Sequence, residues 1–390
     1  MSFYLQDLDI ERHNEDVKAV WEAYHARKPT RVPVVLGVNP RVLLLNPDLN
    51  PDGISFQDYS ADPDLMARVQ MMTQHYVRHN LLQDSEMGPP SDGWAVYPDF
   101  QNTYEARWFG APVEYRPGQV PDTTPILHDD NKRLLFDRGF PDPFAGPCMD
   151  VNWRYHEHMK ANLGSYSCEG VPAGSAVIAA GLGTDGPMTI ACSLRGATEL
   201  CIDFYEDPDF VRELLRYITE ATVVRIKAFR KALGHEEKAT SWGFADDSIE
   251  LLSEEAYRDF VLPCHKALLA DLAGDGPHAV HLCGNVDRLI PVLKEELNID
   301  TWDTGFPVDH GRTRRVLGPD FQISGGPSVA LLLHGSPAAV EAECRRILES
   351  GVTDGGRFVL REGNNLSPCT PVENVTAMYE AAKRHGAYDG

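Results

Sequence analysis

The sequence has no long hydrophobic run and few positive charges for its length of 390 residues. The uncharged run at residues 170–184 is rich in Gly and Ala and shorter than the roughly 20 apolar residues that a membrane-spanning helix requires. Thirty-six Lys and Arg stand against 58 Asp and Glu, giving a net charge of −22. That charge would repel nucleic-acid phosphates and anionic lipid surfaces. We therefore expect neither nucleic acid nor a membrane as a partner.

The sequence also lacks two features of exported proteins. Its first twenty residues, "MSFYLQDLDIERHNEDVKAV", carry carboxylates where a signal peptide needs an apolar core. Its eight cysteines are scattered, without the tight spacing of a disulfide framework. We expect a cytoplasmic protein in which most cysteines are reduced and packed as small hydrophobes.

Strand-like runs alternate with amphipathic helical runs from about residue 186 onward. The six runs are "GPMTIACSL", "ATSWGFADD", "HAVHLCGN", "IDTWDTGF", "FQISGGPS" and "RFVLREGN", and "VPVVLGV" near residue 33 and "WAVYPDF" near residue 94 bring the count to eight. Eight strands alternating with helices predict a (β/α)8 barrel. No Gly-rich G-x-G-x-x-G turn follows any of these runs, which weakens a dinucleotide-binding fold. We predict one α/β domain over residues 1–390, a TIM barrel with N-terminal helices.

Residues 39–185 are less regular and rich in Pro, Gly and aromatic side chains. We interpret them as long insertions around the early strands. Insertions at the carboxyl ends of barrel strands would cover the active site, so Trp108, Phe109 and Tyr115 are candidates for a lid. Packing of these aromatic residues on the outer helices is the alternative.

Polar residues follow several predicted strands, where a barrel gathers its active-site side chains. They are Asp246 and Asp247 after the fourth strand, His281 and Cys283 at the fifth, Asp303 at the sixth, and Asn364, Asn365 and Cys369 after the eighth. We expect Asp246 and Asp303 to be catalytic, with helix capping or a salt bridge as the alternative. We expect Asn39, Asp247 and Asn364 to bind substrate.

His281 and Cys283 lie two residues apart in the run "HAVHLCGNVDRL". Side chains two apart on a strand point to the same face, so this pair could hold one metal ion. The alternative is that His281 forms a hydrogen bond inside the barrel mouth and that Cys283 only packs.

Cys369 precedes a predicted helix that opens with a capping box, in which Thr370 is the N-cap, Pro371 the first residue and Glu373 the third. A helix N-terminus favours the thiolate form of a neighbouring cysteine. With the pair on the fifth strand, Cys369 would give three protein ligands and leave one tetrahedral position open, which is typical of catalytic zinc.

Four segments together resemble the uroporphyrinogen decarboxylase superfamily. They are "GPMTIACSLRGATELCIDFYEDPDFVRELL", "SEEAYRDFVLPCHKALL", "HLCGN" and "TPVENV", and the resemblance covers most of residues 186–390. It implies a (β/α)8 barrel and two candidate activities. The heme-pathway decarboxylases carry an Arg-rich segment after the first strand, where this chain reads "VPVVLGVNPRVLLLNP" with Arg41 as its single cation. Decarboxylation of a porphyrinogen is therefore our second choice.

The other branch of the superfamily comprises zinc-dependent methyltransferases, which move a methyl group between a corrinoid protein or methylated substrate and a thiol. Their signature is His-x-Cys on strand five and a cysteine directly after a glycine near strand eight. "HLC" matches the first part, but Asn364 follows Gly363 and Cys369 lies five residues later. Glu362 or Asp246 could replace the third ligand.

The resemblance to this branch implies bound Zn²⁺, a small-molecule substrate, a corrinoid on a partner protein and a candidate homodimer. Loss of zinc in a divergent member is one alternative. A non-enzymatic ligand-binding barrel, in which His281 and Cys283 are structural, is another.

Overall fold

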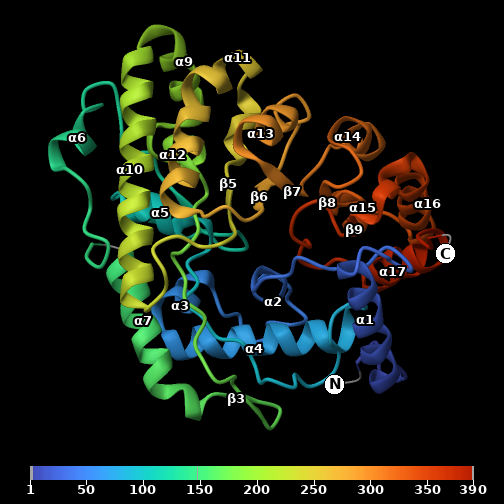
Figure 1. Cartoon of the computed structure of the whole chain (residues 1–390). Helices are drawn as coiled ribbons and strands as arrows, with labels where there is room; N and C mark the ends of the chain where they lie inside the picture. Colours follow the sequence, from blue (N-terminus) through green and yellow to red (C-terminus); the bar gives the residue numbers. More distant parts are fainter. Residues whose placement is uncertain (1–2, 147, 389–390) are drawn as a thin grey trace.

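The computed structural model describes residues 3–146 and 148–388 (Figure 1). Its helices are α1 Ile10–His25, α2 Arg41–Leu44, α3 Phe56–Ala61, α4 Pro63–Asn80, α5 Tyr104–Trp108, α6 Leu134–Arg138, α7 Met149–Asn162, α8 Pro187–Arg195, α9 Ala197–Glu206, α10 Pro208–Ala232, α11 Glu254–Ala256, α12 Leu262–Leu272, α13 Ile290–Leu297, α14 His310–Leu317, α15 Val329–His334, α16 Pro337–Ile347 and α17 Val372–His385. Its strands are β1 Val113–Glu114, β2 Asp122–Thr123, β3 Ser167–Cys168, β4 Val171–Pro172, β5 Trp242–Ala245, β6 His278–Leu282, β7 Ile299–Thr304, β8 Gln322–Gly325 and β9 Phe358–Leu360. None of these helices has both the length and the apolarity needed to cross a bilayer.

Five parallel strands form the regular part of the fold, in the order β5-β6-β7-β8-β9. Helices α10, α12, α13, α14, α16 and α17 follow one another around the outside of this sheet (Figure 1). Each strand came from a predicted apolar run, so the prediction of five of the eight strands is confirmed.

Extended segments continue the sheet beyond both of its edges. Val34 forms a parallel bridge with Leu360 of β9, and the backbone N–H of Asp84 donates to the Val34 carbonyl at 2.6 Å. At the other edge, the N–H of Ala245 in β5 donates to the carbonyl of Thr184 at 3.1 Å. These segments take the first, second and third strand positions of a (β/α)8 barrel.

Two predicted strands are wrong. "GPMTIACSL" is helix α8, because Pro187 stands at its start and the Asp246 carboxylate accepts the backbone N–H groups of Met188 and Thr189 at 3.1 and 2.7 Å. "WAVYPDF" forms no strand of the barrel, and Trp94 makes only one bridge, to Ala173.

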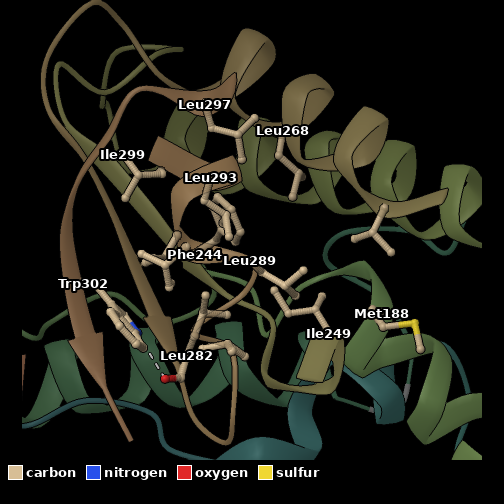
Figure 2. Close-up of a cluster of buried hydrophobic side chains, with 14 of the residues drawn as sticks. Met188, Phe244, Ile249, Leu268, Leu282, Leu289, Leu293, Leu297, Ile299 and Trp302 are labelled. Carbon is tan, nitrogen blue, oxygen red and sulfur yellow. Dashed lines mark hydrogen bonds between the residues drawn. The ribbon is translucent and has the colours of Figure 1, made fainter. Parts of the chain in front are cut away.

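The main core lies between the strands and the outer helices. Figure 2 shows Phe244, Leu282 and Trp302 from the sheet facing Leu268 and Leu293 from α12 and α13. The indole N–H of Trp302 donates to the Leu282 carbonyl at 3.2 Å, the bond drawn dashed in Figure 2. Trp302 and Leu282 are fully buried, so this contact fixes two neighbouring strands in a dry environment.

The predicted lid is wrong for two of its three aromatic residues. Trp108 and Phe109 are buried in the main core, and Phe109 packs against Tyr217 of α10. Tyr115 is half-buried and lines a surface cavity with residues of the 44–57 segment.

A buried ion pair holds the third barrel position. Arg225 of α10 and Glu105 of α5 are 0% and 2% exposed, and the guanidinium donates to the carboxylate. The other oxygen of Glu105 accepts the N–H of Asp185 at 2.6 Å and the hydroxyl of Thr184 at 3.2 Å. The segment at Thr184 is therefore fixed by side chains as well as by its bond to β5.

Candidate metal centre at the carboxyl ends of the strands

Asp247, His281 and Cys283 form a compact group with ligand atoms on all three side chains. One ligand atom from each lies within 4.8 Å of the others, and the described part of the chain contains no other such group of His, Cys, Asp or Glu. Asp247 follows β5, whereas His281 and Cys283 lie at the end of β6. Register brings them together, because Ala245 of β5 pairs with His281 and the Cys283 N–H donates to Asp247 Oδ1 at 2.8 Å.

His281 is oriented by Asp303, which is its register partner on β7. The ring Nδ1 lies 2.8 Å from Asp303 Oδ2, and Nε2 lies 3.4 Å from the Cys283 Sγ. Burial alone would lower the pKa of His281, but its hydrogen bonds to Asp303 and Cys283 raise that pKa to about 10. Nε2 therefore faces the other two ligand atoms, while Nδ1 bonds to the carboxylate, the usual arrangement of a metal-binding histidine.

The group fits a zinc ion in donor type and spacing. Bonds of about 2.0 Å to nitrogen and 2.3 Å to sulfur at a tetrahedral angle place those two atoms about 3.5 Å apart. The observed separation between His281 Nε2 and Cys283 Sγ is 3.4 Å. Nitrogen, thiolate sulfur and carboxylate oxygen are all zinc ligands. Burial raises the pKa of Asp247, and a neighbouring cation would lower that pKa again.

Two glycines allow the strand ends to approach closely. A Cβ on Gly305 would lie 2.6 Å from the Cα and 2.8 Å from the Sγ of Cys283. A Cβ on Gly363 would lie 3.0 Å from the Gly305 carbonyl oxygen. The two distances at Gly305 exclude a side chain, and the one at Gly363 would force its neighbour to shift, so the backbone after β7 packs directly on Cys283.

Arg361 joins Asp303 to a second buried carboxyl group. Its Nη1 donates to Asp303 Oδ1 at 2.7 Å, and its Nη2 donates to Glu362 Oε1 at 3.3 Å. Oε1 also accepts the N–H of Gly37 at 2.7 Å, whereas Oε2 of Glu362 has no partner among the described residues. Glu362 is 0% exposed, and burial raises its pKa to about 8.

The structure gives Asp246 a structural position. This residue is 0% exposed, and its carboxylate bonds to the start of α8 and, at 2.9 Å, to the buried ring of His265. These contacts correspond to the helix-capping alternative and leave the carboxylate no access to a substrate. The catalytic assignment of Asp246 is therefore not retained.

The two predicted substrate-binding asparagines bond locally. The Asn39 side chain accepts the N–H of Arg41 at 3.0 Å, and the Asn364 side chain accepts the N–H of Asn365 at 2.8 Å. Asn364 nevertheless lies at the mouth, because its carbonyl accepts from Arg361 at 3.2 Å.

Cys369 is not brought into the group. It is exposed, and its Sγ lies 3.9 Å from the Leu45 carbonyl. The predicted capping box is wrong, because the Thr370 hydroxyl donates to Ser367 O at 2.8 Å and α17 begins at Val372 with Pro371 as N-cap. The prediction that Cys369 completes the group is wrong for this structure, in which Asp247 lies beside His281 and Cys283.

Sequence reasoning missed Arg361, Gly305 and the place of Asp247 in the group with His281 and Cys283. The adjacent acids at 246 and 247 were a signal, because one of two successive residues after a strand faces the barrel mouth. Nothing local identified Gly305, whose role depends on a contact with another strand.

Comparison with known proteins adds the family. The profile for uroporphyrinogen decarboxylase (URO-D) matches residues 167–385. The chain belongs to this family. The resemblance inferred from four sequence segments is thereby confirmed.

Curated relatives carry both activities of the family. A methylated-thiol–coenzyme M methyltransferase of Methanosarcina mazei is 30% identical over 201 residues, covering 50% of this chain and 51% of the relative. A uroporphyrinogen decarboxylase of Nocardia farcinica is 28% identical over 181 residues, covering 45% and 49%. The methylcobamide:CoM methyltransferase MtaA of Methanosarcina barkeri is 25% identical over 214 residues, covering 53% and 58%. The chain thus spans about half the length of these relatives.

A solved structure confirms the fold. A methyltransferase from Methanosarcina mazei superposes with a TM-score of 0.65, at 19% identity, over 94% of this chain and 98% of that one. The (β/α)8 barrel predicted from the sequence is therefore confirmed as the overall fold.

Proposed function

We propose that this protein is a zinc-dependent methyltransferase, which moves a methyl group from a methylated small molecule or a methyl-corrinoid to a thiol or corrinoid acceptor. The Asp247–His281–Cys283 group at the barrel mouth is the observation that carries this proposal. Similarity to methyltransferases of methylated thiols and methylcobamides supports it.

Each residue of the site has a task in this reaction. Asp247, His281 and Cys283 would hold zinc, which when bound supplies a Lewis acid that lowers the pKa of a thiol. Asp303 keeps His281 Nε2 turned toward the other ligands, and Arg361 holds Asp303 in place. Three protein ligands leave one of four tetrahedral positions for substrate.

The charges at the mouth disfavour the decarboxylase alternative. A porphyrinogen with many carboxylates needs free cations. Arg361 is bonded to Asp303 and Glu362, and Arg41 is bonded to the amide oxygens of Gln101 and Asn102.

The proposal is tested by comparing two cysteine variants, Cys283→Ser and Cys369→Ser. We expect about one zinc per parent chain by mass spectrometry, retained by Cys369→Ser and lost by Cys283→Ser, because Cys369 lies outside the group. Both variants should stay folded, since a strand-end site does not hold a large core together.

Methyl transfer is measured with methylcobalamin or trimethylsulfonium as donor and 2-mercaptoethanol as acceptor. We expect activity in the parent and in Cys369→Ser and none in Cys283→Ser. The assignment would be overturned if the parent contained no zinc at micromolar protein concentration. It would also be overturned if all three proteins contained the same amount of zinc.

A further inference from the structure

A cavity of about 230 Å³ lies directly beside the metal group. Asp247 forms part of its wall together with Asp185, Ile190 of α8 and Ala106 of α5, and Asp122 lies at its edge. A molecule in this cavity would therefore contact one of the three residues that we assign to zinc.

The charged groups left free in this cavity are carboxylates. The Asp185 carboxylate accepts no hydrogen bond from any residue that the structure describes, and its backbone N–H is bound to Glu105. Burial, followed by the charges of Glu105 and Asp247, raises the pKa of Asp185 to about 8. Asp247 uses one oxygen for the Cys283 N–H and would give the other to zinc, whereas exposed Asp122 uses one for the N–H of Thr123 and keeps the other free.

The cations near this cavity are already engaged. Arg225 is bound to Glu105 and to the carbonyl of Gly183, and Arg41 is bound to two amide oxygens. Neither donates a hydrogen bond to Asp185.

The hydroxyl groups of Thr189 and Ser193 are engaged as well, whereas the Thr123 hydroxyl and the Asn102 amide nitrogen form no hydrogen bond with a described residue. Thr189 donates to Asp246 and accepts from the N–H of Ser248, and Ser193 donates to the Thr189 carbonyl. A ligand therefore meets carboxylate oxygens, one amide and one hydroxyl group, together with the apolar surface of Ala106 and Ile190. This combination suits a charged group that is itself covered by methyl groups.

We propose that the cavity binds a small organic cation, and that this cation is the methyl donor, a sulfonium or quaternary ammonium compound. The second half of the proposal rests on the function proposed above. In the transfer, the bond from methyl carbon to sulfur or nitrogen breaks, and both electrons stay on the leaving atom, which becomes neutral. The acceptor thiolate, whose proton has gone to solvent, supplies the electron pair of the new carbon–sulfur bond. The thioether left by a sulfonium donor stays neutral and loses its attraction to Asp185, whereas the amine left by a quaternary ammonium donor can take up a proton.

The test uses choline, its neutral analogue 3,3-dimethylbutan-1-ol and the anion 3,3-dimethylbutanoate. Binding to the full chain is measured by calorimetry at pH 9, with and without added zinc. We expect choline to bind at least about tenfold more tightly than the neutral analogue, and the anion not to compete.

Asp185→Asn keeps the shape of the side chain and removes its charge. We expect it to weaken choline binding about tenfold, while leaving the neutral analogue unchanged. Asp92→Asn is the matched control, because Asp92 is exposed and lies outside the cavity wall. Equal binding of choline and its neutral analogue to the parent would overturn the proposal, whether or not Asp185→Asn folds.

These outcomes are separable from those of the proposed function. If the zinc assignment is wrong, the choline measurement can still be interpreted, because binding requires no turnover. Conversely, zinc binding and methyl transfer from methylcobalamin without any preference for the cation would refute only the cation site.

Discussion

Glu362→Gln should remove a pH dependence from the stability of this protein. Glu362 is 0% exposed, its pKa is raised to about 8, and one of its carboxyl oxygens has no partner among the described residues. Its ordinary pKa in an unfolded chain is about 4.3. Between these two values the folded state holds a proton that the unfolded state has released. The free energy of unfolding therefore falls as pH rises through this window and levels off above about 8.

The size of this effect follows from the pKa difference. Each unit is worth about 1.4 kcal/mol, so the parent should lose on the order of a few kcal/mol between pH 5 and pH 8 relative to the variant. Glutamine preserves the neutral shape and keeps an oxygen that can accept from the Gly37 N–H, the 2.7 Å bond of Oε1. The two proteins should be similarly stable at pH 5, and Glu362→Gln should be the more stable one at pH 9.

Urea unfolding followed by circular dichroism from pH 5 to pH 9 measures the difference between the two proteins. Glu206→Gln is the control, because Glu206 is exposed, and its substitution should leave the pH profile unchanged. If Arg361 instead stabilised an ionised Glu362, the variant would be the less stable protein at pH 9, and our reasoning would be refuted.

Three further predictions concern the metal group and its support. Gly305→Ala should lose zinc and about 1–3 kcal/mol of stability, because its Cβ would lie 2.6 Å from the Cys283 Cα; unchanged zinc by mass spectrometry would contradict this. Asp246→Asn should lower the free energy of unfolding by about 2–4 kcal/mol, because it weakens the buried bonds to Met188 and His265, but the variant should keep its zinc. A variant that loses activity while its stability is unchanged would restore the catalytic assignment of Asp246. Zinc binding at pH 7 should release a proton from His281, whose pKa is raised to about 10, so the affinity for zinc should rise with pH. Calorimetry in buffers of different ionisation enthalpy measures this release, and a result of no released proton would contradict the prediction.

The sequence predicted the half of the barrel that is held by regular strand pairing. Strands β5–β9 came from short apolar runs, and the alternation of faces along β6 correctly placed His281 and Cys283 side by side. These features depend on neighbouring residues, so local patterns reveal them.

The remainder depends on contacts between distant residues. Segment 187–195 is helical because the Asp246 carboxylate caps its start. Asp246 lies 57 residues beyond Thr189, so no local pattern reveals this contact. The first three barrel positions are fixed partly by side chains such as Asp84 and Glu105, which leave no strand pattern in the sequence. The error at Cys369 has a local origin instead, because the Thr370 hydroxyl bonds to the carbonyl of Ser367, three residues earlier, and does not cap α17.

The buried pair of Glu105 and Arg225 has a consequence for the order in which the protein folds. Its partners lie 120 residues apart, so the acid is made well before its counter-charge during synthesis. A buried carboxylate without its partner is strongly unfavourable, by about 3–5 kcal/mol. The wall formed by α5 and the Thr184 segment should therefore stay open on the ribosome until α10 has emerged. A truncated chain that ends before α10 should expose this wall to proteases, whereas one that includes α10 should protect it.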